Sequence, residues 1–151
     1  MPIIPISEFE SYIGKQVGVS EWFKIDQKRI NLFADATLDH QFIHTKPLKA
    51  MLVFGSTIAH GFLTLSLLPY FMQDISLIPE NMKMALNYGL DKVRFLQPVK
   101  VNSSIRASVN LVSITEKKAK HWLVKSEVTM EIKGKEKPAF IAEPLMMFVL
   151  K

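Results

Sequence analysis

FADATLDHQFIH at residues 33–44 and FGSTIAHGFLTLSLL at residues 54–68 are the two stretches that decide how this chain folds. The first stretch places the carboxylate of Asp39 five residues before the imidazole of His44, in a loop without regular periodicity. The second contains Gly61, near which an almost wholly apolar helix is expected to begin. A carboxylate and an imidazole can exchange protons with a substrate, and free amides at a helix start can stabilise an oxyanion. The pattern therefore indicates acid-base chemistry beside an apolar channel.

The helix in the second stretch is expected to begin at about residue 57 or 60 and to end at about residue 74, and its apolar residues occupy every face, which predicts burial nearly all round. Four strand-like segments follow it, at residues 85–95, 104–114, 121–132 and 138–150. Earlier in the chain, residues 17–23 predict a first strand, and Asp26 is the expected N-cap of a helix over residues 27–34. Residues 35–56 are expected to be irregular, with at most a helical turn at residues 48–51.

These elements predict an α+β fold in which an antiparallel sheet wraps around one long buried helix. Consecutive strands are expected to form hairpins, and Lys133-Gly134-Lys135 is the expected connection between the last two. At 151 residues, 48% of them hydrophobic, the chain is expected to form a single domain over residues 1–151.

The composition narrows the classes of function. The chain has no cysteine, which excludes disulfides, thiolate metal sites and a cysteine nucleophile, and agrees with a cytoplasmic location. The net charge of +5 comes with no aromatic and basic stacking surface, so nucleic-acid binding is not indicated. We see no secretory signal, and no apolar run is long enough to span a bilayer. We therefore expect a protein that binds neither nucleic acid nor membrane.

Three motifs carry a resemblance to a known family: DATLDHQFIH at 35–44, FGSTIAHGFLTLSLL at 54–68 and NYGLDKVRF at 87–95. They resemble the MaoC-like dehydratases, which include the (R)-specific enoyl-CoA hydratases, and more narrowly their nodulation-protein-N-like branch. The resemblance covers nearly the whole chain and implies a hot-dog fold. The family motif is usually written Gly-Asp-x-Asn-Pro-x-His, and Asp39 and His44 match its Asp and His.

The chain departs from that motif at Leu38, where Gly is common, and at Gln41-Phe42, where Asn-Pro is common. The second departure is expected of the narrower branch. The first is expected to narrow the pocket or to change substrate preference.

The resemblance implies reversible addition of water to trans-2-enoyl-CoA thioesters, giving (R)-3-hydroxyacyl-CoA. Asp39 and His44 would hold and activate the water, and the amide of Gly61 would bind the thioester oxygen. The third motif suggests further substrate-binding residues that line the pocket, namely Asn87, Tyr88 and Gly89. The implied reaction needs no cofactor.

A metal site is the less favoured interpretation of the first motif. His40 and His44 are four residues apart, which places two ligands on one face only in a helix, and we expect no metal. His60 is expected to fix the start of the helix by hydrogen bonding, outside the catalytic pair.

The partners expected are an acyl-CoA substrate and a second copy of the chain, because a sheet around one helix leaves open edges. Three basic residues are candidates to receive the CoA phosphates, namely Arg94, Lys100 and Arg106. Two other functions stay open at this point. One is a hot-dog acyl-CoA thioesterase, and the other is a non-catalytic protein that binds an acyl group or a signal molecule.

Overall fold

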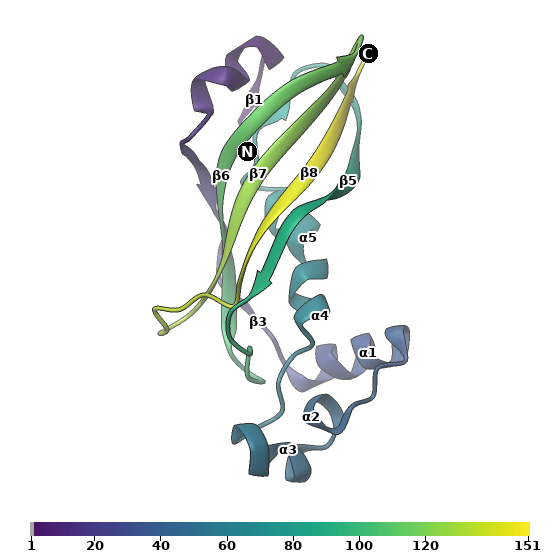
Figure 1. The fold of residues 1–151 in the computed structure, drawn as a ribbon, viewed down its shortest axis with the longest axis vertical. Coiled ribbons are helices and arrows are strands. Elements are labelled where there is room, and N and C mark those ends of the chain that lie inside the picture. Colours follow the sequence, from purple (N-terminus) through teal and green to yellow (C-terminus); the bar gives the residue numbers. More distant parts are fainter. Residues whose placement is uncertain (1) are drawn as a thin grey trace.

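A curved antiparallel sheet holds a pair of short helices against its concave face, and three further helices extend beyond one end of it (Figure 1). The computed structural model describes residues 2–151. The main sheet contains β2 (Gln16–Val19), β3 (Phe23–Lys24), β5 (Met82–Phe95), β6 (Ser104–Lys118), β7 (His121–Ile132) and β8 (Phe140–Leu150). A separate parallel pair is formed by β1 (Ile3–Ile4) and β4 (Ile78–Pro79). The helices are η1 (Ile6–Tyr12), α1 (Gln27–Thr37), α2 (Phe42–Thr45), α3 (Pro47–Phe54), α4 (Gly61–Ser66) and α5 (Leu68–Met72).

The four predicted long strands are all present, and the sheet is antiparallel throughout. The neighbours run in the order β2, β6, β7, β8, β5, so β6, β7 and β8 form consecutive hairpins as expected. The expectation was wrong for β5, which pairs with β8 and not with β6. Residues 96–103 cross from β5, at one edge of the sheet, to β6 near the other edge, and main-chain bonds from Ala59 to Val99 and from Val101 to Thr57 hold them there.

The core lies between the concave face of the sheet and the helix pair formed by α4 and α5. Along β7 every second residue from Val124 onward is buried, which matches the alternation in the sequence. The helices contribute Leu63, Leu68 and Phe71 to the same apolar cluster. At residues 2–151 no helix is both long and apolar enough to cross a bilayer.

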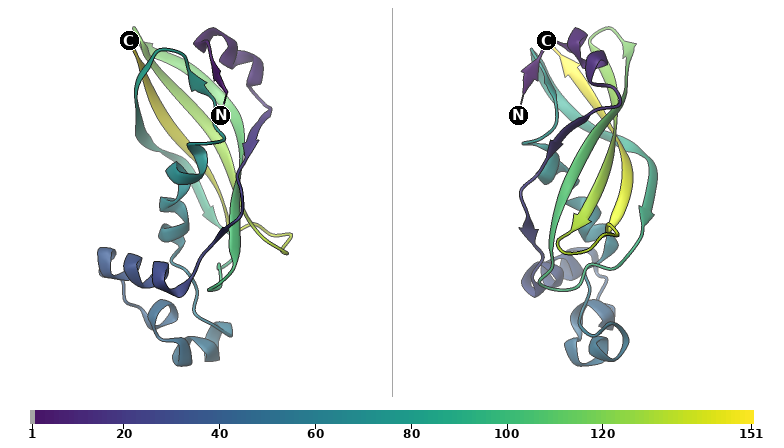
Figure 2. Two further views of the ribbon diagram at one scale, coloured as in Figure 1. Left: turned by 180° about the vertical axis from the view of Figure 1, so that it is seen from behind. Right: turned by 90° about the vertical axis from the view of Figure 1, so that its left-hand side faces the viewer.

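The central helix differs from the prediction in two respects. It consists of α4 and α5, separated at Leu67, because Pro69 has no N–H with which to continue the helical bonding. It is also not buried all round, since Phe62 is 69% exposed and Tyr70 lies half exposed. The sheet curves around one side of the helix pair and leaves the other open (Figure 2).

The helical lobe before the central helix is more ordered than expected. Asp26 is the N-cap of α1, as predicted, and accepts a hydrogen bond from the Arg29 amide at 2.8 Å. The segment predicted to be irregular contains α2 and α3. The one turn of α2 is too short to show a periodicity, whereas α3 has a proline at its start and Gly55, with φ of 75°, at its end. His44 therefore lies in a helical turn and not in a loop.

Candidate active site

Asp39, His44 and His60 come together where α1, α2 and α4 meet. Asp39 follows α1, His44 lies in α2, and His60 is the N-cap residue of α4. One side-chain oxygen or nitrogen of each residue lies within 4.8 Å of those of the other two. The fold thus brings together the pair that the sequence predicts and adds a second histidine.

The His44 ring is buried and its protonation state is set by its surroundings. Its Nδ1 lies 2.7 Å from the main-chain oxygen of Ile58. Because a carbonyl oxygen can only accept, Nδ1 carries the hydrogen and Nε2 keeps its lone pair. Burial lowers the pKa of His44 below its ordinary value of 6.5, and the nearby His60 acts in the same direction, against the Ile58 bond and Asp39. His44 is therefore a neutral imidazole with a free basic nitrogen at neutral pH.

His60 lies against Asp39 and His44, contrary to the role expected for it. It makes no capping bond at the start of α4. Its Nε2 donates instead to the main-chain oxygen of Asp39 at 2.9 Å, and its ring stacks on that of His44, with centroids 3.7 Å apart. Its Nδ1 is buried without a hydrogen-bond partner among residues 2–151. The sequence signal that could have found this role is the adjacency of His60 to Gly61 in the second motif.

Asp39 is the accessible member of the group, with a side chain 44% exposed. Its Oδ1 accepts a hydrogen bond from the Gln41 amide at 3.3 Å. His40, the other histidine of the first motif, points elsewhere and pairs with Asp35 at 2.8 Å. The spacing of His40 and His44 thus forms no ligand pair, and the carboxylate of Asp39 faces solvent next to the buried imidazole.

Leu38 does not narrow a pocket, because it is 82% exposed and does not line the cavity that lies between the sheet and the helices α4 and α5. Its importance is conformational, since it ends α1 in the left-handed region with φ of 62°. Glycine adopts this conformation without penalty, whereas a residue with a Cβ loses about 1 kcal/mol or more. The departure from the family motif at this position therefore affects the backbone that leads into Asp39.

Gly61 is the first residue of α4, so its amide has no acceptor within the helix. A Cβ at this position would lie 2.9 Å from Cε1 of Phe95. Glycine is therefore needed so that the ring of Phe95, at the end of β5, can lie against the start of the helix. The group that approaches Gly61 closely in the structure is thus the ring of Phe95.

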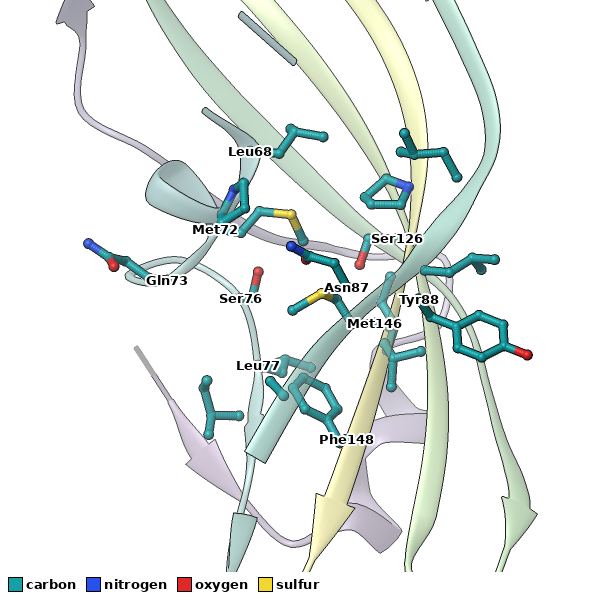
Figure 3. A pocket seen from close by; sticks show the side chains of 18 of the residues that line it. Leu68, Met72, Gln73, Ser76, Leu77, Asn87, Tyr88, Ser126, Met146 and Phe148 are labelled. Carbon is teal, nitrogen blue, oxygen red and sulfur yellow. The ribbon is translucent and has the colours of Figure 1, made fainter. Parts of the chain in front are cut away.

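A cavity of about 760 Å³ lies between the helix pair and the sheet, farther along from the start of α4 (Figure 3). Its apolar lining includes Leu65, Leu68, Met72, Leu90, Leu145 and Phe148. Asn87, Tyr88 and Gly89 also line it, although the Tyr88 ring points outward (Figure 3). Asp39, His44 and Gly61 are not part of the lining, so the polar cluster and the apolar cavity occupy successive positions along the helix pair.

The three basic candidates for CoA phosphates differ in availability. Arg94 and Lys100 are exposed. Arg106 is not free, because its guanidinium pairs with Glu131 at 2.7 Å and lies over the Trp22 ring. Arg94 and Lys100 are therefore the more available of the three candidates.

Comparisons with known proteins agree with this geometry. Residues 8–132 match the family described as MaoC like domain. The chain is 42% identical over 145 residues to 3-hydroxyacyl-thioester dehydratase Z of Mycobacterium tuberculosis, covering 95% of both chains. It is 46% identical over 143 residues to nodulation protein N of Rhizobium leguminosarum, covering 92% of this chain and 88% of that protein.

Two solved structures show the same fold. A monoamine oxidase regulatory protein from Archaeoglobus has a TM-score of 0.81 at 26% identity, over 100% of this chain and 99% of that one. The (R)-hydratase from A. caviae has a TM-score of 0.71 at 21% identity, over 88% and 96% of the two chains. The fold and site thus define a hot-dog hydro-lyase of the hydratase and dehydratase class. The chain belongs to the MaoC-like domain family.

Proposed function

We propose that this chain is a single-domain, cytoplasmic (R)-specific enoyl-CoA hydratase, which also catalyses the reverse dehydration of 3-hydroxyacyl-CoA. The observation that carries the proposal is the arrangement of His44, whose Nδ1 is bound to the Ile58 oxygen so that Nε2 can accept a proton, and which has a ring nitrogen within 4.8 Å of an Asp39 carboxylate oxygen. A basic nitrogen and a carboxylate so close together can act on one water molecule. The 42% identity to a protein named as a 3-hydroxyacyl-thioester dehydratase supports the same class of substrate.

The proposed reaction uses one water held between the two side chains. Nε2 of His44 accepts a proton as the water oxygen attacks the β-carbon of the enoyl thioester, and the Asp39 side chain orients the same water. The proton that Nε2 of His44 has accepted is then delivered to the α-carbon, so the elements of one water add to the same face of the double bond and His44 returns to the neutral imidazole. The Gly61 amide is the proposed donor to the thioester oxygen, on which negative charge develops.

His60 is a positioning residue in this proposal. Its bond to the Asp39 main chain and its stacking on His44 hold the two catalytic groups at a fixed separation. The three side chains are also close enough to bind a metal ion, but the fold already uses Nε2 of His60 for the Asp39 carbonyl. We therefore favour water over a metal as the group bound between them.

The acyl chain is proposed to run along the helix pair into the apolar cavity. Leu65 and Ser66 line the cavity, and they follow Gly61 by about one helical turn. An acyl chain whose thioester lies at Gly61 therefore reaches the cavity after a few carbons. A cavity of about 760 Å³ is within the range of small-molecule sites.

The test is hydration of crotonyl-CoA and longer trans-2-enoyl-CoAs, followed by the loss of enoyl-thioester absorbance. We expect turnover by the native protein, and losses of at least a hundredfold for Asp39→Asn and for His44→Ala. His40→Ala is the matched control, because His40 lies in the same motif but pairs with Asp35. Inert native protein would refute the hydratase, and release of free CoA thiol without hydration would identify a thioesterase.

We also propose a homodimer formed along β5. Within residues 2–151 β8 is the only strand that pairs with β5, and most residues of β5 are exposed. The exposed residues include three large side chains, Leu86, Tyr88 and Leu90. A long apolar edge strand invites pairing with another strand, and a two-fold axis beside β5 would pair it with its own copy. Light scattering should then give a mass about twice the 17.2 kDa of one chain.

A further inference from the structure

Six residues with polar side chains line the cavity between the helix pair and the sheet, and three of them lie near one another among apolar side chains. They are Ser76, which follows α5, Asn87 on β5 and Ser126 on β7. Figure 3 shows the three near one another, among the apolar side chains of the lining. The reaction proposed above uses none of them.

Ser126 breaks the pattern of its own strand. The inward-facing row of β7 is otherwise apolar from Val124 through Val128 and Met130 to Ile132. Ser126 is only 7% exposed, and its hydroxyl makes no hydrogen bond to any of residues 2–151. The hydroxyl is not among the fully buried polar atoms, so it reaches the cavity surface, and it makes no bond within the described chain that alanine would lose. It does supply a polar group to whatever fills the cavity.

The other two side chains extend the same polar spot. The hydroxyl of Ser76 is buried and has no hydrogen-bond partner within residues 2–151. The side-chain amide of Asn87 likewise makes no hydrogen bond in the described part of the chain, and it reaches into the cavity from β5 (Figure 3). Hydroxyls and amides can both donate and accept, so Ser126 and Asn87 can bind a hydroxyl or a keto oxygen in the cavity, while the Ser76 hydroxyl lies fully buried beside them.

We infer that the cavity selects acyl chains that carry an oxygen function, a hydroxyl or a keto group, well away from the thioester. This inference rests on the proposed hydratase function. Leu68 and Met72 line the cavity, and at a helical rise they follow Gly61 by about 10 and 16 Å. The oxygen that meets the polar spot is therefore several carbons beyond the double bond. It identifies the substrate and takes no part in the reaction.

The test compares plain trans-2-enoyl-CoAs with chains of the same length in which a hydroxyl is moved one carbon at a time. We expect kcat/KM to peak at one hydroxyl position, about tenfold above the plain chain, which is the effect of one good hydrogen bond. Ser126→Ala and Asn87→Leu should each reduce this preference about tenfold. Ser113→Ala, on β6 and outside the cavity lining, is the matched control and should keep it.

Two further measurements separate the possible failures. Turnover of crotonyl-CoA, which is too short to reach the polar spot, tests the hydratase function alone. Calorimetric binding of saturated acyl-CoAs with and without the hydroxyl tests the preference without any turnover. Equal binding and equal kcat/KM for the two chains would overturn the inference and leave the cavity as a plain acyl site whose polar groups bind water. A large fall in the melting temperature of Ser126→Ala would also overturn it, by giving the hydroxyl a role in folding.

Discussion

Replacing His60 tests whether the second histidine positions the catalytic pair or only fills space. His60→Phe keeps a ring stacked between Phe33 and His44 but removes the hydrogen bond to the Asp39 carbonyl. The lost bond costs about 1 kcal/mol of folding free energy, and removal of the unpartnered Nδ1 returns about 1–3 kcal/mol. We therefore expect the free energy of unfolding to stay the same or to rise.

The activity of the same variant should fall, because the Asp39 main chain is no longer held by the side chain next to it. A displacement of about 1 Å in a catalytic group can cost about a hundredfold in rate, so we expect a 10- to 100-fold loss in kcat/KM. His60→Gln can donate from nearly the same place and should restore part of the activity. The assays are urea unfolding and enoyl-CoA hydration on the same preparations.

Opposite behaviour would refute the positioning role. If His60→Phe unfolds at clearly lower urea while each folded molecule hydrates at the native rate, His60 serves the core and not the reaction. The variant should also shift the acid limb of the pH-rate profile upward, because the nearby His60 contributes to the lowered pKa of His44.

Three further predictions concern single groups. Because the pKa of His44 is lowered in the fold, the stability that its neutral imidazole contributes is complete above pH 6.5 and is lost as the pH falls below that value. The value of kcat/KM should fall over the same acid range. Profiles of rate and of unfolding against pH, compared with those of His44→Ala, check both effects. Leu38→Gly should raise the free energy of unfolding by about 1 kcal/mol, measured in urea, because glycine adopts φ of 62° freely; a loss of stability would contradict the strain at this residue. Leu90→Lys, at the exposed edge of β5, should lower the mass measured by light scattering toward 17.2 kDa, and an unchanged dimer would place the interface elsewhere.

The sequence anticipated the long strands and the site pair for different reasons. In β7 the alternation of apolar and polar residues follows directly from the geometry of a strand with one buried face, so a local pattern is enough. Asp39 and His44 were found through a motif whose two members are close in sequence. Asp26 was found because N-capping is a local effect.

The break in the central helix at Leu67 and the helices α2 and α3 were missed within local stretches of sequence, whereas two other errors concern contacts between distant segments. The pairing of β5 with β8 depends on how residues 96–103 cross the end of the sheet, which no local period encodes. The stacking of His60 on His44 joins residues that are sixteen positions apart, and the sequence between them has no repeat that would place the two rings together.

The sequence by itself determined the long strands, the N-cap of α1 and the closeness of Asp39 and His44, because each depends on residues that are neighbours along the chain. Only the tertiary structure decided the state of that pair. The Ile58 carbonyl sets which nitrogen of His44 is free, His60 holds the Asp39 main chain, and Phe95 occupies the space beside Gly61. Hydrogen bonds and ring contacts of this kind depend on the relative placement of separate elements, which packing fixes after the elements have formed.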